Sequence, residues 1–366
     1  MSNTAPAGAE AATTASNPLA ERLWQAEMAA LELYAVYLGD QLGLYAALAE
    51  GGPATPEALA RRTGTSERYV REWLEQQAVT GFVDVEDASA GPGDRCYSLS
   101  PDHVEALVDR DSLSFSAHKA VEIVRAGRRL PDLVEAFRSG GGIPPAPWEP
   151  EGRSDSNRAR YVNLLGERWL RSIPAVEARL NAEPPARVAD VACGTGWSSI
   201  AMARAFPGIT VDGFDLDPDA VRQATEHAGA SGVGDRVTFR TADAAEPGST
   251  GRYDLVTIFE ALHDMTRPVE ALRAARTLLG EGGWLLVADE LVGDRFAVPA
   301  TDRERYAYGW SVVSCLPDAM GDPGTAATGA VLRPATLRAY AIDAGFRDAE
   351  VLPIDTGFWR FYRLVP

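Results

Sequence analysis

The chain has 366 residues, a formal net charge of −17 and 46% hydrophobic residues. This length predicts about two domains, and so acidic a chain disfavours nucleic acid and anionic membranes as partners. No apolar run reaches the ~18 residues of a membrane span, and residues 1–17 lack the pattern of a secretory signal. The three cysteines are scattered, and no Cys/His cluster has metal-ligand spacing, so we expect a cytoplasmic protein without a metal.

The N-terminal part reads as a disordered tail, 1–17, followed by a helical domain, 18–100. Apolar residues at helical spacing predict a first helix over 19–49 with a wide apolar face, which usually packs against another helix or subunit. Two shorter helices, capped by Thr55 and Ser66, precede two short alternating strands. Their predicted ranges are 56–63, 67–80, 82–85 and 95–99. This order of elements predicts a winged-helix domain.

A winged helix can bind DNA, but its second helix here is charge-balanced. It carries Arg68 and Arg71 together with three glutamates, at 67, 72 and 75. A helix that reads DNA aims basic and amide side chains at base edges. We therefore expect residues 18–100 to form a homodimer rather than to bind nucleic acid.

The next region, 101–184, is mostly helical in pattern and is interrupted between Gly140 and Trp148. We interpret it as a linker and a lid over the substrate. Its aromatic residues, with Trp148 and Trp169 as the candidates, would wall the acceptor pocket. The alternative is that they are ordinary core residues.

From residue 185 the chain alternates strands and helices. Strands are predicted over 188–192, 209–214, 236–241, 253–259 and 284–288, with helices over 198–206, 218–230 and 268–279. After an interruption at 291–330, a helix over 334–344 precedes a hairpin of strands over 348–354 and 359–365. The pattern predicts an α/β fold in which a parallel sheet carries an antiparallel hairpin at one edge.

The first predicted strand ends in a small-residue turn, Cys193-Gly194-Thr195-Gly196. Glycines allow a ligand to approach the backbone, and the following helix offers free N–H groups to an anion. A dinucleotide site would need a third glycine, which is missing. Asp190 would repel a pyrophosphate but can hold an ammonium group, so the turn suits an amino-acid moiety. The alternative is a turn that binds no ligand.

Acids also follow the second and third strands of this part of the chain. Because ligands of such sheets bind at the carboxyl ends of the strands, Asp190, Asp215 and Asp243 should lie at one edge. Asp215 stands 19 residues after Gly196, the spacing of an acid that binds ribose hydroxyls. Asp243 could accept a hydrogen bond from an adenine amino group.

Together, the acid-and-glycine turn, G-F-D-L-D around Asp215 and T-A-D-A around Asp243 resemble the class I S-adenosylmethionine (SAM) methyltransferases. Ala192 stands at the first glycine of their motif. The resemblance covers 185–366 and implies a Rossmann-like, SAM-binding domain. The SAM site that it implies consists of Asp190, Ala192, Gly194, Gly196, Asp215, Leu216, Asp243, Ala244 and Phe259.

The segment after the fourth strand, F-E-A-L-H-D, resembles the L-H-D segment of small-molecule O-methyltransferases. In those enzymes the histidine is the general base that deprotonates the acceptor hydroxyl, which implies this role for His263. Glu290, 27 residues on, would orient the histidine. Asp264 would assist it or cap the next helix. Met265 replaces the tryptophan of the plant pattern, and the chain looks closer to actinobacterial methyltransferases with a winged-helix domain and L-H-D-M.

The acceptor pocket should lie over the ends of strands four and five, beneath the insertion 291–330. Its aromatic and thioether side chains favour a mostly apolar, ring-containing acceptor, with Tyr308, Trp310 and Met320 as candidate contacts. We therefore expect methyl transfer to a hydroxyl of a secondary metabolite. The alternatives are a SAM-dependent enzyme that cyclises or eliminates, and a SAM-binding transcriptional regulator.

Overall fold

The computed structural model describes residues 17–143, 156–246, 248, 252–321 and 324–366. The candidate Trp148 and the expected tail, apart from Asn17, lie outside the described residues. The chain divides into two compact units, Met1–Val104 and Glu105–Pro366. The helical region from residue 105 onward therefore belongs to the same unit as the sheet.

Unit 1 contains the elements of the expected winged helix. They are α1 (Pro18–Gln41), α2 (Leu44–Gly51), α3 (Pro56–Thr63), α4 (Glu67–Val79), β1 (Asp84–Val85) and β2 (Tyr97–Ser98). The predicted first helix is divided in two because Gly43 has a φ of +65°, a left-handed conformation that breaks the helix. Thr55 caps α3 through Ala58 N, whereas Ser66 makes no side-chain cap bond to α4.

One face of α1 packs in unit 1, and another is exposed. The indole Nε1 of Trp73 donates to the Ala35 carbonyl at 2.8 Å, which ties α4 to α1. Five large apolar side chains of α1 are each at least 50% exposed: Leu19, Leu23, Trp24, Leu31 and Leu38. Among the described helices, none is both long and apolar enough to cross a membrane.

The basic residues of α4 form ion pairs within the helix. Arg68 pairs with Glu72 at 2.5 Å, and Arg71 pairs with Glu67 at 3.5 Å. Each pair joins residues four positions apart. These guanidinium groups therefore already have carboxylate partners.

Unit 2 begins with helical segments that lead to the sheet. They are α5 (Pro101–Leu107, which spans the boundary), α6 (His118–Arg128), α7 (Leu130–Ser139), α8 (Arg158–Arg160), the π-helix η1 (Tyr161–Trp169), η2 (Leu170–Ser172) and α9 (Pro174–Leu180). The expected helical stretch around 158–180 is thus π-helical at its centre. Gly166 lets η1 pack closely, since a Cβ there would lie 2.3 Å from the Cβ of Ala205 in α10.

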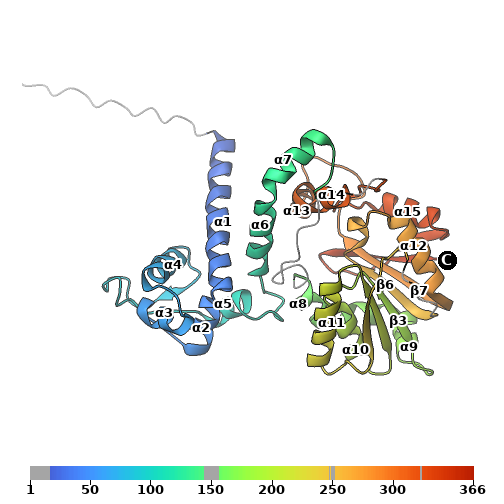
Figure 1. The fold of residues 1–366 in the computed structure, drawn as a ribbon, viewed down its shortest axis with the longest axis horizontal. Coiled ribbons are helices and arrows are strands. Elements are labelled where there is room, and N and C mark those ends of the chain that lie inside the picture. Colours follow the sequence, from blue (N-terminus) through green and yellow to red (C-terminus); the bar gives the residue numbers. More distant parts are fainter. Residues whose placement is uncertain (1–16, 144–155, 247, 249–251, 322–323) are drawn as a thin grey trace, which may run out of the picture. The chain divides into compact units, whose positions relative to one another are not determined.

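The remaining elements alternate as the sequence predicted (Figure 1). They are β3 (Arg187–Val191), α10 (Trp197–Ala205), β4 (Thr210–Asp215), α11 (Pro218–Ala230), β5 (Val237–Thr241), β6 (Tyr253–Phe259), η3 (Leu262–Asp264), α12 (Pro268–Leu278) and β7 (Leu279–Glu290). The insertion holds α13 (Asp302–Trp310), the π-helix η4 (Ser311–Cys315) and α14 (Leu316–Ala319), before α15 (Pro334–Asp343), β8 (Asp348–Val351) and β9 (Trp359–Val365).

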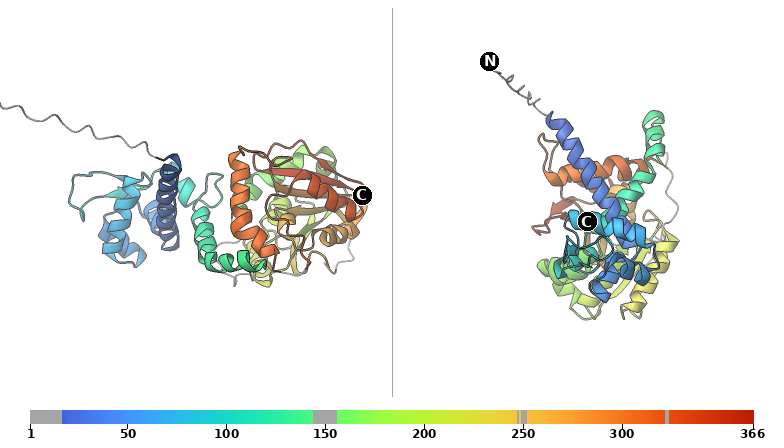
Figure 2. Two further views of the ribbon diagram at one scale, coloured as in Figure 1. Left: turned by 90° about the horizontal axis from the view of Figure 1, so that it is seen from above. Right: turned by 90° about the vertical axis from the view of Figure 1, so that its left-hand side faces the viewer.

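The seven strands form one sheet in the order β5-β4-β3-β6-β7-β9-β8. The first five strands of this order are parallel, and β9 pairs antiparallel with both β7 and β8. The hairpin lies at one edge of the sheet and is drawn in red in Figure 2. The predicted α/β, Rossmann-like sheet with its C-terminal antiparallel hairpin is confirmed.

Two helical layers cover the sheet. The core under η1, α9, α10 and α11 includes Leu165, Ile200 and Phe361. The core under α12 and α15 includes Leu272, Leu337 and Val287. The chain winds outward from β3 in one direction to β5 and then returns to place β6 on the other side of β3. Sheets of this kind bind ligands at such a switch point, beyond the carboxyl ends of the strands.

Candidate functional site

A cavity of about 1340 Å³ lies at the carboxyl edge of the sheet. One end, which we call the cofactor end because the sequence predicts SAM there, is walled by Ala192, Gly194, Asp215, Leu216, Asp243 and Ala244. The other, which we call the acceptor end after the predicted acceptor pocket, is walled by residues of α6, α13 and the ends of β6 and β7, including Glu122, Glu260, His263, Glu290, Tyr306 and Trp310. A second space of about 120 Å³, the inner cavity, adjoins the glycine turn and shares Asn157, Gly194 and Glu260 with the first. The larger cavity has room for a nucleoside and a second small molecule.

Asp190 supports the turn from within the protein. Its Oδ2 accepts hydrogen bonds from the hydroxyls of Ser198 at 2.5 Å and Ser199 at 2.7 Å. Its Oδ1 accepts from the Thr257 hydroxyl at 2.7 Å. The residue is 1% exposed, and burial raises the pKa of its carboxyl although the three hydroxyl bonds oppose this. The Asp190 oxygens thus join β3, α10 and β6 while the residue borders the inner cavity, and its expected contact with an ammonium group stays a prediction.

The turn itself uses left-handed backbone conformations. The φ angles of Ala192, Gly194 and Gly196 are +58°, +54° and +83°. Such a conformation costs an alanine roughly 1 kcal/mol. A Cβ on Gly196 would lie 2.5 Å from the Phe239 ring, so packing requires this glycine, and it does not line either cavity.

The two other strand-end acids line the cofactor end, each already holding partners. Asp215 accepts from Gly194 N at 2.7 Å and from Asp217 N at 3.0 Å, which fixes its carboxylate. Asp243 pairs with Arg267 at 2.5 Å. Beside Asp215, the apolar side chain of Leu216 is 70% exposed. A polar edge with an adjoining apolar surface fits a nucleoside.

At the acceptor end, His263 is held by a carboxylate. Its Nδ1 lies 2.8 Å from Asp289 Oδ1, and its backbone N donates to Asp289 Oδ2 at 3.3 Å. When the imidazole is neutral, the Asp289 carboxylate accepts the proton of Nδ1, which leaves Nε2 as the acceptor. Burial lowers the pKa of His263, but the carboxylates of Asp264 and Asp289 outweigh burial and raise it well above 6.5.

The carboxylate that orients His263 is Asp289, and the assignment of this role to Glu290 is corrected. Consecutive residues of a strand point to opposite faces, so Asp289 and Glu290 cannot both face the histidine. Glu290 instead lines the cavity at 6% exposure. Its Oε2 is buried without a hydrogen-bond partner among the described residues, and burial raises its pKa to about 7. The adjacent acids were visible in the sequence, but the face that each takes was not.

Asp264 also departs from one of its two expected roles. The N-cap position of α12 is Arg267, which makes no side-chain cap bond, and Asp264 does not cap this helix. Its Oδ1 lies 3.3 Å from His263 Nε2. The ligand atoms of His263, Asp264 and Cys315 lie within 4.8 Å of one another and could hold a metal ion. Sequence spacing missed this cluster because the fold brings Cys315 from a distant segment, and a metal-free site stays a prediction.

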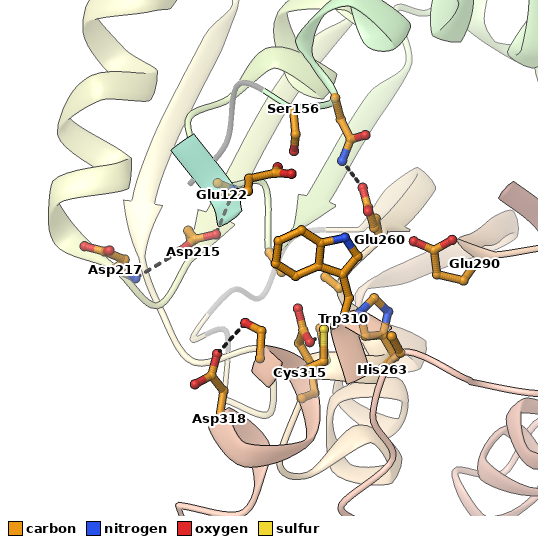
Figure 3. A pocket seen from close by; sticks show the side chains of 18 of the residues that line it. Glu122, Ser156, Asp215, Asp217, Glu260, His263, Glu290, Trp310, Cys315 and Asp318 are labelled. Atoms are coloured by element: carbon orange, nitrogen blue, oxygen red, sulfur yellow. Dashed lines mark hydrogen bonds and ion pairs between the residues drawn. The ribbon is translucent and has the colours of Figure 1, made fainter. Parts of the chain in front are cut away.

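Sequence reasoning singled out no role for Glu260, although it follows β6 directly. Its φ is +50°, and its Oε2 accepts a hydrogen bond from Asn157 Nδ2. Burial raises its pKa well above 4.5, and the nearby Glu290 adds to the rise. Figure 3 shows Glu260 and Glu290 on the same side of Trp310 as His263, with Asp215 on the other side.

The aromatic candidates are only partly in the wall. Trp310 lines the acceptor end, as does Tyr306 four residues earlier on the same face of α13. Tyr308 faces elsewhere, since its hydroxyl accepts from Arg333 at 3.2 Å. Trp169 is 1% exposed and packs in the core against Trp359, with ring centroids 5.4 Å apart.

Of the two remaining residues that the sequence predicted at the site, one borders a cavity and one does not. Met320 is not among the residues that line the described cavities, whereas Phe259 borders the inner cavity. The acceptor end is more charged than expected, because it also contains Arg160 and Arg303. Their guanidinium groups lie 4.0 and 4.7 Å from the centre of the Phe358 ring. The lining is therefore more polar than the sequence indicated, and a mostly apolar, ring-containing acceptor stays a prediction.

Two parts of the chain match known protein families. Residues 188–283 match the family described as "Methyltransferase domain", and residues 29–109 match the "Rv2258c-like winged HTH domain". The ubiquinone biosynthesis O-methyltransferase of Ralstonia nicotianae is 30% identical over 207 residues, which are 56% of this chain and 77% of that one.

Two solved structures share the fold over nearly the whole chain. The mitomycin 7-O-methyltransferase has a TM-score of 0.68 at 23% identity, covering 95% of this chain and 97% of that one. Human N-acetylserotonin methyltransferase in complex with SAM has a TM-score of 0.66 at 19% identity, covering 96% and 99%.

Proposed function

We propose, from the premise that this chain belongs to the SAM-dependent O-methyltransferases, that it methylates a hydroxyl of a polar, ring-containing secondary metabolite with His263 as the general base. The observation that carries this proposal is the buried Asp289–His263 pair at 2.8 Å. It leaves His263 Nε2 as a proton acceptor in the wall of a cavity that also has a nucleoside-sized cofactor end.

The residues of the cofactor end fit SAM. Gly194 and Thr195 border the cavity at the turn, Asp215 can accept from ribose hydroxyls, and Leu216 offers an apolar surface to adenine. Asp243 keeps lone pairs beyond its bonds to Arg267 and to Ala245 N for an adenine amino group. When bound, SAM supplies an electrophilic methyl group on its sulfonium.

The work of the chain is alignment and proton removal. His263 Nε2 takes the proton of the acceptor hydroxyl, and the imidazolium formed is stabilised by Asp289 and Asp264. A positioned base of this kind contributes about 10²–10⁴-fold in rate. Holding the hydroxyl in line with the transferring group contributes through orientation.

We propose that Glu290 recognises the acceptor. Its unpartnered Oε2 is a buried hydrogen-bond acceptor in the cavity wall. Leaving such an atom unsatisfied costs free energy, and a donor group of the acceptor would remove this cost. Trp310 and Tyr306 supply ring surfaces at the same end.

The test is product formation from SAM with a panel of hydroxylated ring compounds that carry polar substituents, each paired with its methyl ether. The wild type should methylate a hydroxyl compound and not the corresponding ether. His263→Ala should lower kcat by about 10² or more, while His103→Ala in α5 leaves it unchanged. An unchanged kcat in His263→Ala would contradict the base role, and cyclised or eliminated products would favour the other class of SAM enzyme.

We also propose that unit 1 joins two copies of the chain through the exposed apolar face of α1. The face is long, and the guanidinium groups that DNA binding would use are paired with glutamates. Sedimentation should give a dimer for the wild type and a monomer for Leu23→Glu with Leu31→Glu. A monomeric wild type would contradict this arrangement.

A further inference from the structure

The inner cavity, of about 120 Å³, lies beside the glycine turn and the N-terminus of α10. Asp215 and Asp243, which suit ribose and adenine, line the larger cavity and not this one. If the larger cavity holds the adenosine part of SAM, the inner cavity is the space next to the turn that remains for its amino-acid part. The inference below therefore rests on the proposed function.

An amino-acid moiety needs a partner for its ammonium group. The carboxylates that border the inner cavity belong to Asp190 and Glu260. Asp190 already accepts three hydroxyl hydrogen bonds and is almost fully buried. Glu260 accepts one side-chain hydrogen bond, from an amide, and has no ion pair among the described residues.

Glu260 is held in position by its surroundings. Arg160 Nη1 donates to Asn157 Oδ1 at 2.9 Å, and Asn157 Nδ2 donates in turn to the Glu260 carboxylate. The backbone N of Glu260 donates to the Ala288 carbonyl at 2.7 Å, which fixes this residue to β7. Its left-handed φ of +50° is a conformation that costs a non-glycine residue about 1–3 kcal/mol and persists where the surroundings enforce it.

The electrostatics of this position favour a cation. Glu260 is half-buried, and a carboxylate taken out of water is costly unless it is paired and hydrogen-bonded. Arg160 lies near enough to oppose the rise in the pKa of Glu260, but its guanidinium stacks on Phe358 and does not pair with the carboxylate. A ligand ammonium would supply the missing charge.

We infer that Glu260 binds the ammonium group of the amino-acid part of SAM and of its product S-adenosylhomocysteine, with Asn157 orienting the carboxylate. Asp190, the acid of the turn motif, then acts as a structural bridge. Recognition of the amino acid thus comes from the residue after β6, immediately next to the acceptor end.

Calorimetric titration with three ligands tests this inference. SAM carries an ammonium and a sulfonium, S-adenosylhomocysteine carries the ammonium alone, and 5′-methylthioadenosine carries neither. In Glu260→Gln, the Kd values of SAM and S-adenosylhomocysteine should rise by the same factor, about tenfold or more, as for loss of a charged hydrogen bond. The Kd of 5′-methylthioadenosine should stay unchanged, which also shows that the variant is folded. Glu270→Gln on α12, which is exposed, is the matched control.

Each other outcome has a defined meaning. A loss confined to SAM would show that Glu260 acts on the sulfonium and would overturn the inference. An equal loss for all three ligands, or no loss for any, would also overturn it. If the wild type binds none of the ligands, the proposed SAM site itself fails, whereas wild-type binding that Glu260→Gln leaves intact removes only this inference.

Discussion

The two ends of the cavity differ in how their carboxylates are satisfied. At the cofactor end, Asp215 accepts two backbone N–H groups and Asp243 pairs with Arg267. Behind the turn, Asp190 accepts three hydroxyls. At the acceptor end, Glu290 keeps a buried oxygen without a partner among the described residues, and burial raises its pKa to about 7.

This difference distinguishes carboxylates that hold the site in a fixed geometry from a carboxyl group that can recognise a ligand. Carboxylates whose bonds are made by the chain hold one geometry whether or not a ligand is bound. A buried carboxyl with an open lone pair carries a desolvation cost that a ligand can relieve. The comparison predicts that mutations at the two ends will change different quantities, namely stability at any pH at the first end, and catalysis, proton affinity or the pH dependence of stability at the second.

The largest effect should come from Asp289→Asn. An asparagine amide would donate to His263 Nδ1 and move the imidazole proton to Nε2, where it blocks the base. We expect kcat to fall by about 10²–10⁴ while the Kd of S-adenosylhomocysteine stays unchanged. A variant with wild-type kcat would show that the catalytic base is not His263. The acceptor end would then no longer differ from the cofactor end in its role in catalysis.

Asp190→Ala should act mainly on stability. It strips the hydroxyls of Ser198, Ser199 and Thr257 of their shared acceptor. Buried groups left unsatisfied in this way should lower the free energy of unfolding in urea by about 2–4 kcal/mol.

The matched variant at the same end is Asp243→Ala, whose ion pair with Arg267 is half-exposed. It should cost no more than about 1 kcal/mol. Equal losses in Asp190→Ala and Asp243→Ala would mean that the buried bridge does not hold this end together.

Asp264→Asn should lower the pKa of His263. The Asp264 carboxylate lies 3.3 Å from Nε2 and is one of the two charges that raise this pKa against the effect of burial. Since the base must be unprotonated, activity rises with pH through this pKa, and the rising limb should move to lower pH in the variant. NMR titration of the His263 ring measures the shift without an acceptor, and a shift to higher pKa would contradict the assignment.

Glu290→Gln should give the smallest effect, a gain in stability at high pH. The folded-state pKa of about 7 exceeds the ordinary 4.5, so the folded protein holds this proton more tightly than the unfolded chain. The free energy of unfolding of the wild type therefore falls as pH rises from 4.5 to 7.

A glutamine at position 290 does not titrate, so the variant should not lose unfolding free energy at this position as pH rises. The variant should melt about 2–4 °C above the wild type at pH 8, and the difference should shrink as pH falls to about 5. A lower melting temperature of the variant at pH 8 would show that the Glu290 carboxylate forms stabilising interactions within the protein. The carboxylates at the two ends of the cavity would then not differ in this respect.

The sequence by itself determined the sheet and the edge at which the site lies. Hydrophobic alternation and glycine turns placed the strands to within a few residues, apart from β7, which begins at Leu279. Because parallel strands present their carboxyl ends at one edge, Asp215, Asp243 and His263 had to gather there. Local order along the chain was enough for these inferences.

Only the tertiary structure decided what each side chain contacts. Asp289 and Glu290 are neighbours on β7, and their side chains point in opposite directions. Asp289 therefore contacts His263, whereas Glu290 lines the cavity. Trp169 packs in the core, and hydroxyl groups of α10 and β6 donate hydrogen bonds to the oxygens of Asp190. Such outcomes depend on packing between segments far apart in the chain, which no local pattern encodes.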